Sequence, residues 1–160
     1  MKTAIVYATR YGAVRECAQR VAAELSHGAT LIELDRTARP KLLEYSTVIV
    51  GGSFYAGAIQ PAVRNFCAAS RADLLARTVV LFACGLATGE EARRQLEAAF
   101  PDWLRSHALS CSILGAKIRP AKLGLLDRFF YKRAYGGRWN MDALDSAAIS
   151  QIATQVNALM

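Results

Sequence analysis

The chain has 160 residues, 53% of them hydrophobic and 21% charged, with a formal net charge of +7. This length and composition fit one globular domain, 1–160, and exclude a disordered chain. The sequence has no apolar run long enough to span a membrane, and an apolar segment follows Met1-Lys2-Thr3 directly. We therefore expect neither a signal peptide nor a membrane helix, but a cytoplasmic protein. The four cysteines are far apart, which favours reduced thiols over a metal site or a disulfide framework.

Short apolar segments alternate with helical patterns along the chain. The apolar segments predict strands at Thr3–Ala8, Thr30–Asp35, Thr47–Gly51, Thr78–Cys84 and Leu109–Ile118. Helical periodicity predicts helices at Val14–Ser26, Pro61–Ala69, Glu90–Phe100 and Met141–Leu159, the last capped by Asn140 or Asp142. Strands that alternate with helices predict an α/β fold: a doubly wound, five-stranded parallel sheet with helices on both faces.

The first candidate site is the loop Thr9–Val14, between the first strand and the first helix. It contains neither G-x-G-x-x-G nor G-x-x-x-x-G-K-[ST], which argues against a dinucleotide or a nucleoside triphosphate. The hydroxyl of Thr9 and the guanidinium of Arg10 can donate to phosphate, and Gly12 allows close backbone approach. The loop therefore fits a phosphate monoester at a helix N-terminus, and an ordinary strand-to-helix turn stays equally open.

Two later loops follow the third and fourth predicted strands, and they meet the first loop at the carboxyl edge of such a sheet. The segment Ser53–Ile59 places Phe54 and Tyr55 beside small residues, and a planar ligand needs an aromatic face to stack on. Which of the two aromatics faces a ligand, and which one caps the core, stays open. The segment Cys84–Gly89 is rich in glycine, and its backbone can meet the polar edge of a flat ring.

Three motifs make the chain resemble the flavodoxin-fold FMN proteins, and most of all the menaquinone-dependent protoporphyrinogen IX dehydrogenase group. The likeness covers nearly the whole chain. The motifs are Thr9-Arg10-x-Gly12-x-x-Arg15-Glu16-x-Ala18, Gly51-x-Ser53-x-x-x-Gly57, and the late segment Gly115-Ala116 … Arg119-Pro120 … Asp127-Arg128-Phe129 … Gly136-Gly137. The first two are general to flavodoxin-like domains, and the third indicates the dehydrogenase group.

The resemblance implies a flavodoxin-like sheet with strand order 2-1-3-4-5 and FMN as the cofactor. The residues that would surround the FMN phosphate are Thr9, Arg10, Tyr11, Gly12, Ala13 and Val14. The residues that would hold the isoalloxazine ring are Ser53, Phe54, Tyr55, Ala56, Gly57, Cys84, Gly85, Leu86, Ala87 and Thr88. The flavin would carry the chemistry, so no catalytic side chain is expected.

The sequence departs from the flavodoxin pattern in two ways. Tyr11 and Val14 stand where flavodoxins usually carry hydroxyl side chains, and each lost neutral hydrogen bond weakens FMN binding by about 1 kcal/mol. The chain is also basic, whereas ordinary flavodoxins are acidic and suit basic redox partners. We therefore expect an FMN-dependent oxidoreductase, with oxidation of protoporphyrinogen IX by a quinone as the specific reaction. A flavodoxin-type electron carrier that serves a redox partner protein, and a scaffold that has lost its cofactor, are the alternatives.

A basic insertion, residues 117–138, precedes the predicted C-terminal helix. It holds seven Lys or Arg residues and one acid, Asp127, so it carries +6 of the net charge. Its mixture of bases, leucines and phenylalanines suits peripheral contact with the inner face of a membrane, or a flat substrate that bears carboxylates. A helix or loop with its bases in solvent is the alternative. The segment lacks nucleic-acid recognition motifs, so we expect no nucleic-acid partner.

Overall fold

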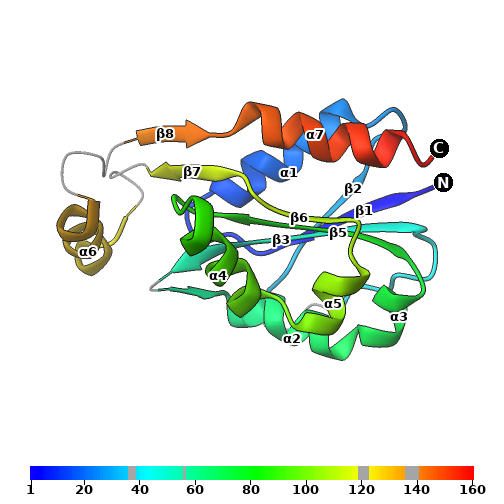
Figure 1. The fold of residues 1–160 in the computed structure, drawn as a ribbon, viewed down its shortest axis with the longest axis horizontal. Coiled ribbons are helices and arrows are strands. Elements are labelled where there is room, and N and C mark those ends of the chain that lie inside the picture. The colour runs from blue at the N-terminus through cyan, green and yellow to red at the C-terminus, as the bar shows by residue number, and fades with distance from the viewer. Residues whose placement is uncertain (36–38, 56, 119–122, 136–140) are drawn as a thin grey trace.

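The computed structural model describes residues 1–35, 39–55, 57–118, 123–135 and 141–160. Five parallel strands form the central sheet in the order β2-β1-β3-β5-β6, and β4 adds to β3 in the antiparallel sense (Figure 1). Their bounds are β1 Thr3–Tyr7, β2 Thr30–Glu33, β3 Thr47–Tyr55, β4 Ala58–Ile59, β5 Thr78–Cys84 and β6 Ser110–Ile113. Counted without the short β4, this is the predicted order 2-1-3-4-5, and the doubly wound α/β fold is confirmed.

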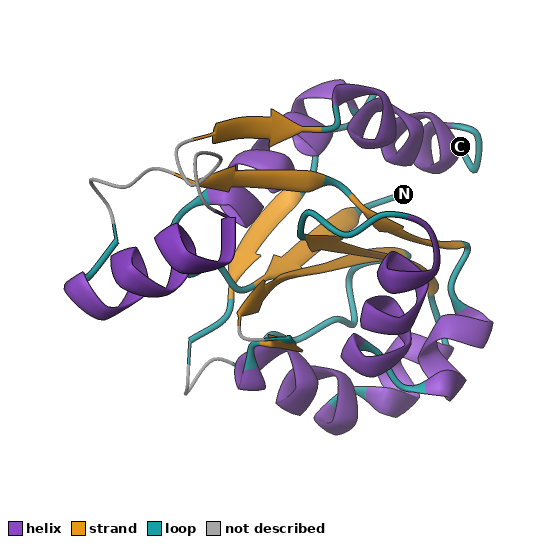
Figure 2. Cartoon of the chain, turned by 60° about the vertical axis from the view of Figure 1, so that its left-hand side comes forward, coloured by secondary structure: helices purple, strands orange, loops and turns teal. Residues whose placement is uncertain are grey.

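Helices cover both faces of the sheet, as Figures 1 and 2 show. The bounds are α1 Ala13–Glu24, α2 Pro61–Ala69, α3 Arg71–Leu75, α4 Gly89–Ala99, α5 Asp102–His107, α6 Leu125–Tyr135 and α7 Ser146–Asn157. Alternate strand residues point to opposite faces, so the sheet separates two apolar clusters. Ile5, Ile49 and Phe82 pack against α1 and α7, whereas Val6 and Val50 belong to the cluster under α2 to α5. Sequence reasoning missed the two short helices, α3 and α5.

The predicted fifth strand is wrong in its length, because Leu109–Ile118 divides into two strands. β6 pairs with β5 and ends at Ile113, and β7, Gly115–Ile118, pairs instead with β8, Met141–Leu144. Gly115 has φ 78°, and a Cβ at this position would lie 2.0 Å from the carbonyl oxygen of Ala143. Only glycine fits there, so the chain turns out of the parallel sheet at this residue.

The predicted C-terminal helix begins too early. Residues Met141–Leu144 form β8, and α7 begins at Ser146, where the side chain of Asp145 accepts a hydrogen bond from the N–H of Ala148 at 3.0 Å. Asp142, one of the two predicted caps, lies in β8 opposite Lys117 and forms an ion pair with it. Asn140, the other predicted cap, lies outside the described residues. Pairing with β7, which is distant in sequence, overrides the local helical pattern.

The third strand is longer than predicted, because β3 continues from Gly51 to Tyr55 and turns into β4. The glycines of this strand are packing residues. A Cβ on Gly51 would lie 2.1 Å from Cζ of Phe82, and one on Gly52 would lie 2.7 Å from Cδ1 of Ile59. Most of the predicted loop Ser53–Ile59 is therefore a β-hairpin, which holds its side chains more rigidly than a loop would.

Candidate functional site

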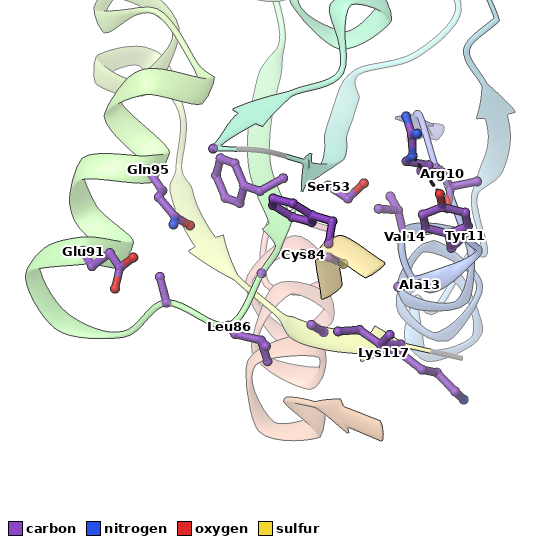
Figure 3. Close-up of a pocket in the computed structure, with 18 residues that line it drawn as sticks. Arg10, Tyr11, Ala13, Val14, Ser53, Cys84, Leu86, Glu91, Gln95 and Lys117 are labelled. Atoms are coloured by element: carbon purple, nitrogen blue, oxygen red, sulfur yellow. Dashed lines mark hydrogen bonds between the residues drawn. The ribbon is translucent and has the colours of Figure 1, made fainter. Parts of the chain in front are cut away.

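A cavity of about 400 Å³ opens at the carboxyl ends of β1, β3 and β5, where ligands bind in sheets of this kind (Figure 3). Its volume lies in the range of small-molecule sites, about 300–1,000 Å³. Predicted site residues that line it are Thr9, Arg10, Tyr11, Ala13, Val14, Ser53, Phe54, Gly57, Cys84, Gly85, Leu86 and Ala87. Gly12, Tyr55 and Thr88 are not among the lining residues, and Ala56 lies outside the described residues.

The first wall is the phosphate loop, as we name residues Thr9–Val14. Gly12 adopts φ 98° and is the N-cap residue directly before α1, and its N–H donates to Oγ1 of Thr9 at 3.0 Å. The first intrahelical bond runs from the N–H of Glu16 to the carbonyl of Gly12, so the N–H groups of the first turn have no acceptor within the helix. This positive helix end lies at the cavity wall, because Ala13 and Val14 both line it. The loop is therefore built to receive an anion.

Val14 is fully buried in the apolar cluster under α1 and α7, although it also lines the cavity. The hydroxyl of Tyr11 accepts a hydrogen bond from Nε of Arg10 at 3.1 Å. Neither residue offers the cavity a short hydroxyl side chain, so the loop must bind an anion chiefly through backbone N–H groups and Thr9.

The guanidinium of Arg10 is already engaged. Its Nη2 donates to Oδ2 of Asp127 at 3.0 Å, and its Cζ lies 3.7 Å from the ring centroid of Tyr55. The hydroxyl of Tyr55 donates to Oδ1 of the same carboxylate. Sequence reasoning assigned Arg10 to phosphate and Tyr55 to the flavin, but it did not identify Asp127 as their shared partner.

The second wall is the β3–β4 hairpin. The sequence left open which of Phe54 and Tyr55 faces a ligand. In the structure Phe54 lines the cavity and Tyr55 does not. Gln60 holds the hairpin: its Nε2 donates to Oγ of Ser53 at 2.7 Å and to the carbonyl of Ala8 at 3.2 Å. Its Oε1 accepts from the N–H of Ser53 at 2.8 Å. Sequence reasoning missed Gln60, a polar residue directly before the helix-starting Pro61.

The third wall follows β5 and continues into α4. A Cβ on Gly85 would lie 3.0 Å from Cδ2 of Phe54, so glycine allows the two walls to approach closely. Glu91 and Gln95 of α4 also line the cavity, opposite the phosphate loop in Figure 3. Sequence reasoning missed both residues. Their positions are a usable signal, because they lie two and six residues after Gly89, where α4 begins directly behind a predicted site loop. Thr88 occupies the N-cap position of α4 without a side-chain cap hydrogen bond, and it is not among the lining residues.

Cys84 forms an apolar part of this wall. Its Sγ lies 3.7 Å from Sγ of Cys17, and both residues are buried. The hydrogen bond with Cys17, together with burial, raises the pKa of the Cys84 thiol well above its usual value. The thiol therefore stays neutral at neutral pH and is not a nucleophile.

The fourth wall comes from the segment that the sequence marked as basic. Ala116, Lys117 and Ile118 of β7 line the cavity together with Phe130 of α6. Nζ of Lys117 lies 2.8 Å from Oε2 of Glu16 and 3.1 Å from Oδ2 of Asp142, so acids balance its charge. Arg15 makes a similar pair with Glu33 at 2.8 Å. The Arg15-Glu16 part of the first motif thus joins α1 to its neighbouring strands.

In the described part of the chain, no group of three or more His, Cys, Asp or Glu side chains could hold a metal ion. No helix among the described residues is both long enough and apolar enough to cross a membrane.

The solved structures with a similar fold include a flavodoxin, a flavoprotein and a larger oxidoreductase. Oxidised flavodoxin 1 from Bacillus cereus matches with a TM-score of 0.62 and 12% identity, over 100% of this chain and 99% of that chain. A flavoprotein in complex with FMN from Lactobacillus acidophilus matches with a TM-score of 0.54 and 12% identity, over 70% and 92%. Rubredoxin oxygen:oxidoreductase from Desulfovibrio gigas matches with a TM-score of 0.62 and 12% identity, over 99% of this chain and 35% of that chain. This chain thus spans about a third of the length of that oxidoreductase.

Sequence comparison identifies the family. A search of the curated proteins found no match. The model of the flavodoxin domain family matches residues 4–135, which include the phosphate loop, the hairpin and α6. The chain therefore belongs to the flavodoxin domain family.

Proposed function

We propose that this chain binds FMN in the cavity and acts as an FMN-dependent oxidoreductase. One observation carries the proposal: a single cavity lies between the N-terminus of α1, where Gly12 is left-handed, and a wall lined by an aromatic ring and glycines. The phosphate of FMN suits the helix N-terminus, and its flat ring suits the aromatic wall. Family membership and the FMN complex of the Lactobacillus acidophilus neighbour support this choice of ligand. When bound, FMN supplies the electron-transfer chemistry.

The chain's own residues would bind and orient the cofactor. The first-turn N–H groups of α1 and the hydroxyl of Thr9 would donate to the phosphate. Phe54 and Leu86 would contact the ring, and the backbone around Gly85 would meet its polar edge. Because Gln60 holds Ser53 and the carbonyl of Ala8 together, the two ends of the ligand would meet walls of fixed spacing.

A flavin titration tests this assignment. We expect FMN to bind one-to-one, with quenched fluorescence, and riboflavin to bind at least tenfold more weakly. The substitution Ala13→Asp places a carboxylate at the first turn of α1, and we expect it to weaken FMN at least tenfold and riboflavin little. The control is Ala147→Asp, which makes the same change in the exposed first turn of α7. Equal affinity for FMN and riboflavin, or unchanged FMN binding by the Ala13 variant, would refute the assignment.

We propose oxidation of protoporphyrinogen IX with a quinone as acceptor as the specific reaction. The late motif with Asp127-Arg128-Phe129 supports it, and so does the presence of Phe130 beside the cavity, where a flat organic substrate could pack. The test is anaerobic porphyrin formation by the FMN-loaded protein with a quinone present. An FMN-loaded protein without such turnover would favour the alternative, an electron carrier for a redox partner protein. The full-length match to the Bacillus cereus flavodoxin favours that alternative.

We also propose that α6 contacts the inner face of a membrane, where a quinone would be available. Leu125 and Leu126 are each 86% exposed, Phe129 is exposed too, and Lys132 and Arg133 are exposed on the same helix. Exposed apolar side chains among bases suit an anionic lipid surface. Co-sedimentation with anionic vesicles, but not with zwitterionic ones, is the expected result. A double substitution Lys132→Glu with Arg133→Glu that left sedimentation unchanged would contradict the proposal.

A further inference from the structure

One carboxylate joins α6 to the phosphate loop. Asp127 is only 8% exposed, and it accepts hydrogen bonds from Nη2 of Arg10 and from the hydroxyl of Tyr55. A buried carboxylate is stable only when such partners compensate for its lost hydration. We name these three residues the Arg10–Tyr55–Asp127 cluster. Its members come from the loop after β1, the end of β3 and the first turn of α6.

The cluster positions α6 beside the cavity. Phe130, one turn after Asp127, lines the cavity, and its ring centroid lies 6.0 Å from that of Tyr55. The side of α6 with Leu125, Leu126 and Phe129 is exposed. The bonds that Asp127 accepts therefore contribute to holding Phe130 at the cavity.

The same cluster limits what Arg10 can do for a phosphate. A guanidinium grips a phosphate best with two parallel N–H groups on one edge, and both of its accessible edges include Nη2. Nη2 donates to Asp127, Nε donates to the hydroxyl of Tyr11, and the face of the group lies over Tyr55. Nη2 carries two N–H groups and Asp127 takes one of them, so a phosphate that pairs with Arg10 shares the guanidinium with this carboxylate, and the two anions repel each other.

We propose that Asp127 and the phosphate group of a bound ligand compete for the guanidinium of Arg10. A phosphate that wins this competition loosens α6, and an intact cluster lowers the affinity for phosphate. This inference rests on the proposed binding of a phosphate-bearing flavin. Under this competition, the position of α6 depends on whether a phosphate occupies the phosphate loop. After the cofactor binds, α6 with its bases and exposed apolar side chains becomes free to meet a partner.

Flavin affinities test the competition. Asp127→Asn removes the negative charge and keeps the shape, so FMN should bind at least fivefold more tightly while riboflavin changes less than twofold. Asp102→Asn is the control, because it makes the same charge change in the exposed first turn of α5, far from α6 in Figure 1. Arg10→Ala should weaken FMN more in the Asp127→Asn background than in the wild type. Unchanged FMN affinity of Asp127→Asn, or an equal gain for riboflavin, would overturn the competition.

Hydrogen exchange of the α6 amides, residues 125–135, tests the cluster without any ligand. Asp127→Asn and Tyr55→Phe should each speed exchange at least tenfold, and the wild type should exchange faster with FMN than with riboflavin. Tyr55→Phe keeps the ring under Arg10 and removes only the hydroxyl, so it tests the cluster even where Asp127→Asn folds poorly. Unchanged α6 exchange in both variants would refute the role of the cluster. A failure of every variant to bind flavin would overturn the proposed function and the competition together. In that case, faster α6 exchange in the ligand-free Asp127→Asn and Tyr55→Phe variants would still identify the cluster as a contact that holds α6.

Discussion

The substitution Gly51→Ala tests how the strand beneath the site is packed. The added Cβ would lie 2.1, 2.3 and 2.6 Å from three ring carbons of Phe82, whereas carbon atoms pack at about 3.5–4.0 Å. Phe82 is fully buried, so its ring cannot move aside without displacing other core residues. Overpacking of a core costs about 1–3 kcal/mol, and this overlap belongs at the upper end, about 3 kcal/mol. For a chain of this size the melting temperature should fall by about 6–12 °C.

Urea denaturation followed by circular dichroism measures this loss as a lower midpoint at an unchanged slope. The double variant Gly51→Ala with Phe82→Leu should be more stable than Gly51→Ala alone, because the smaller side chain relieves the overlap. Gly28→Ala is the control: its φ is 65° and nothing lies within 4 Å of its added Cβ. It should therefore cost only the left-handed strain, about 1–2 kcal/mol. A Gly51→Ala protein within about 0.5 kcal/mol of the wild type would refute the packing argument.

Two further predictions concern the phosphate loop and a buried thiol. Thr9→Val removes the acceptor of the Gly12 N–H and should weaken FMN binding about tenfold, whereas Thr9→Ser keeps the hydroxyl and should bind FMN like the wild type. An equal loss of FMN affinity in both variants would contradict a role of the hydroxyl. Burial raises the pKa of Cys67 from 9.0 to about 12, so the unfolded thiol loses its proton at lower pH than the folded one. Stability relative to Cys67→Ala should be fully present below about pH 9 and fall above it by about 1.4 kcal/mol per pH unit in urea titrations. A difference that does not change with pH would contradict this burial.

The sequence predicted the site best where the determinants are local. A strand, a loop with Gly12 and a helix start are consecutive in sequence, and the structure has that glycine in the left-handed region at the N-terminus of α1. The short loop after Cys84 is likewise next in sequence to a predicted strand, and Gly85, Leu86 and Ala87 line the cavity as predicted. In contrast, Glu91, Gln95 and Phe130 reach the cavity from helices whose orientation depends on packing against the rest of the molecule. Their sequence patterns are those of ordinary helices.

The alternation of apolar and helical segments by itself determined the doubly wound sheet and the edge at which the loops gather, because both periodicities are local properties of the chain. The strand order was implied by the resemblance to flavodoxin-fold proteins. Tertiary structure alone decided that Leu109–Ile118 divides at Gly115 and that β8 replaces the start of the last helix. It also decided that Arg10 meets Asp127, which lies 117 positions away. The physical reason is the same in each case: a strand needs its hydrogen-bonding partner and a buried carboxylate needs its donors, and here distant parts of the chain supply them.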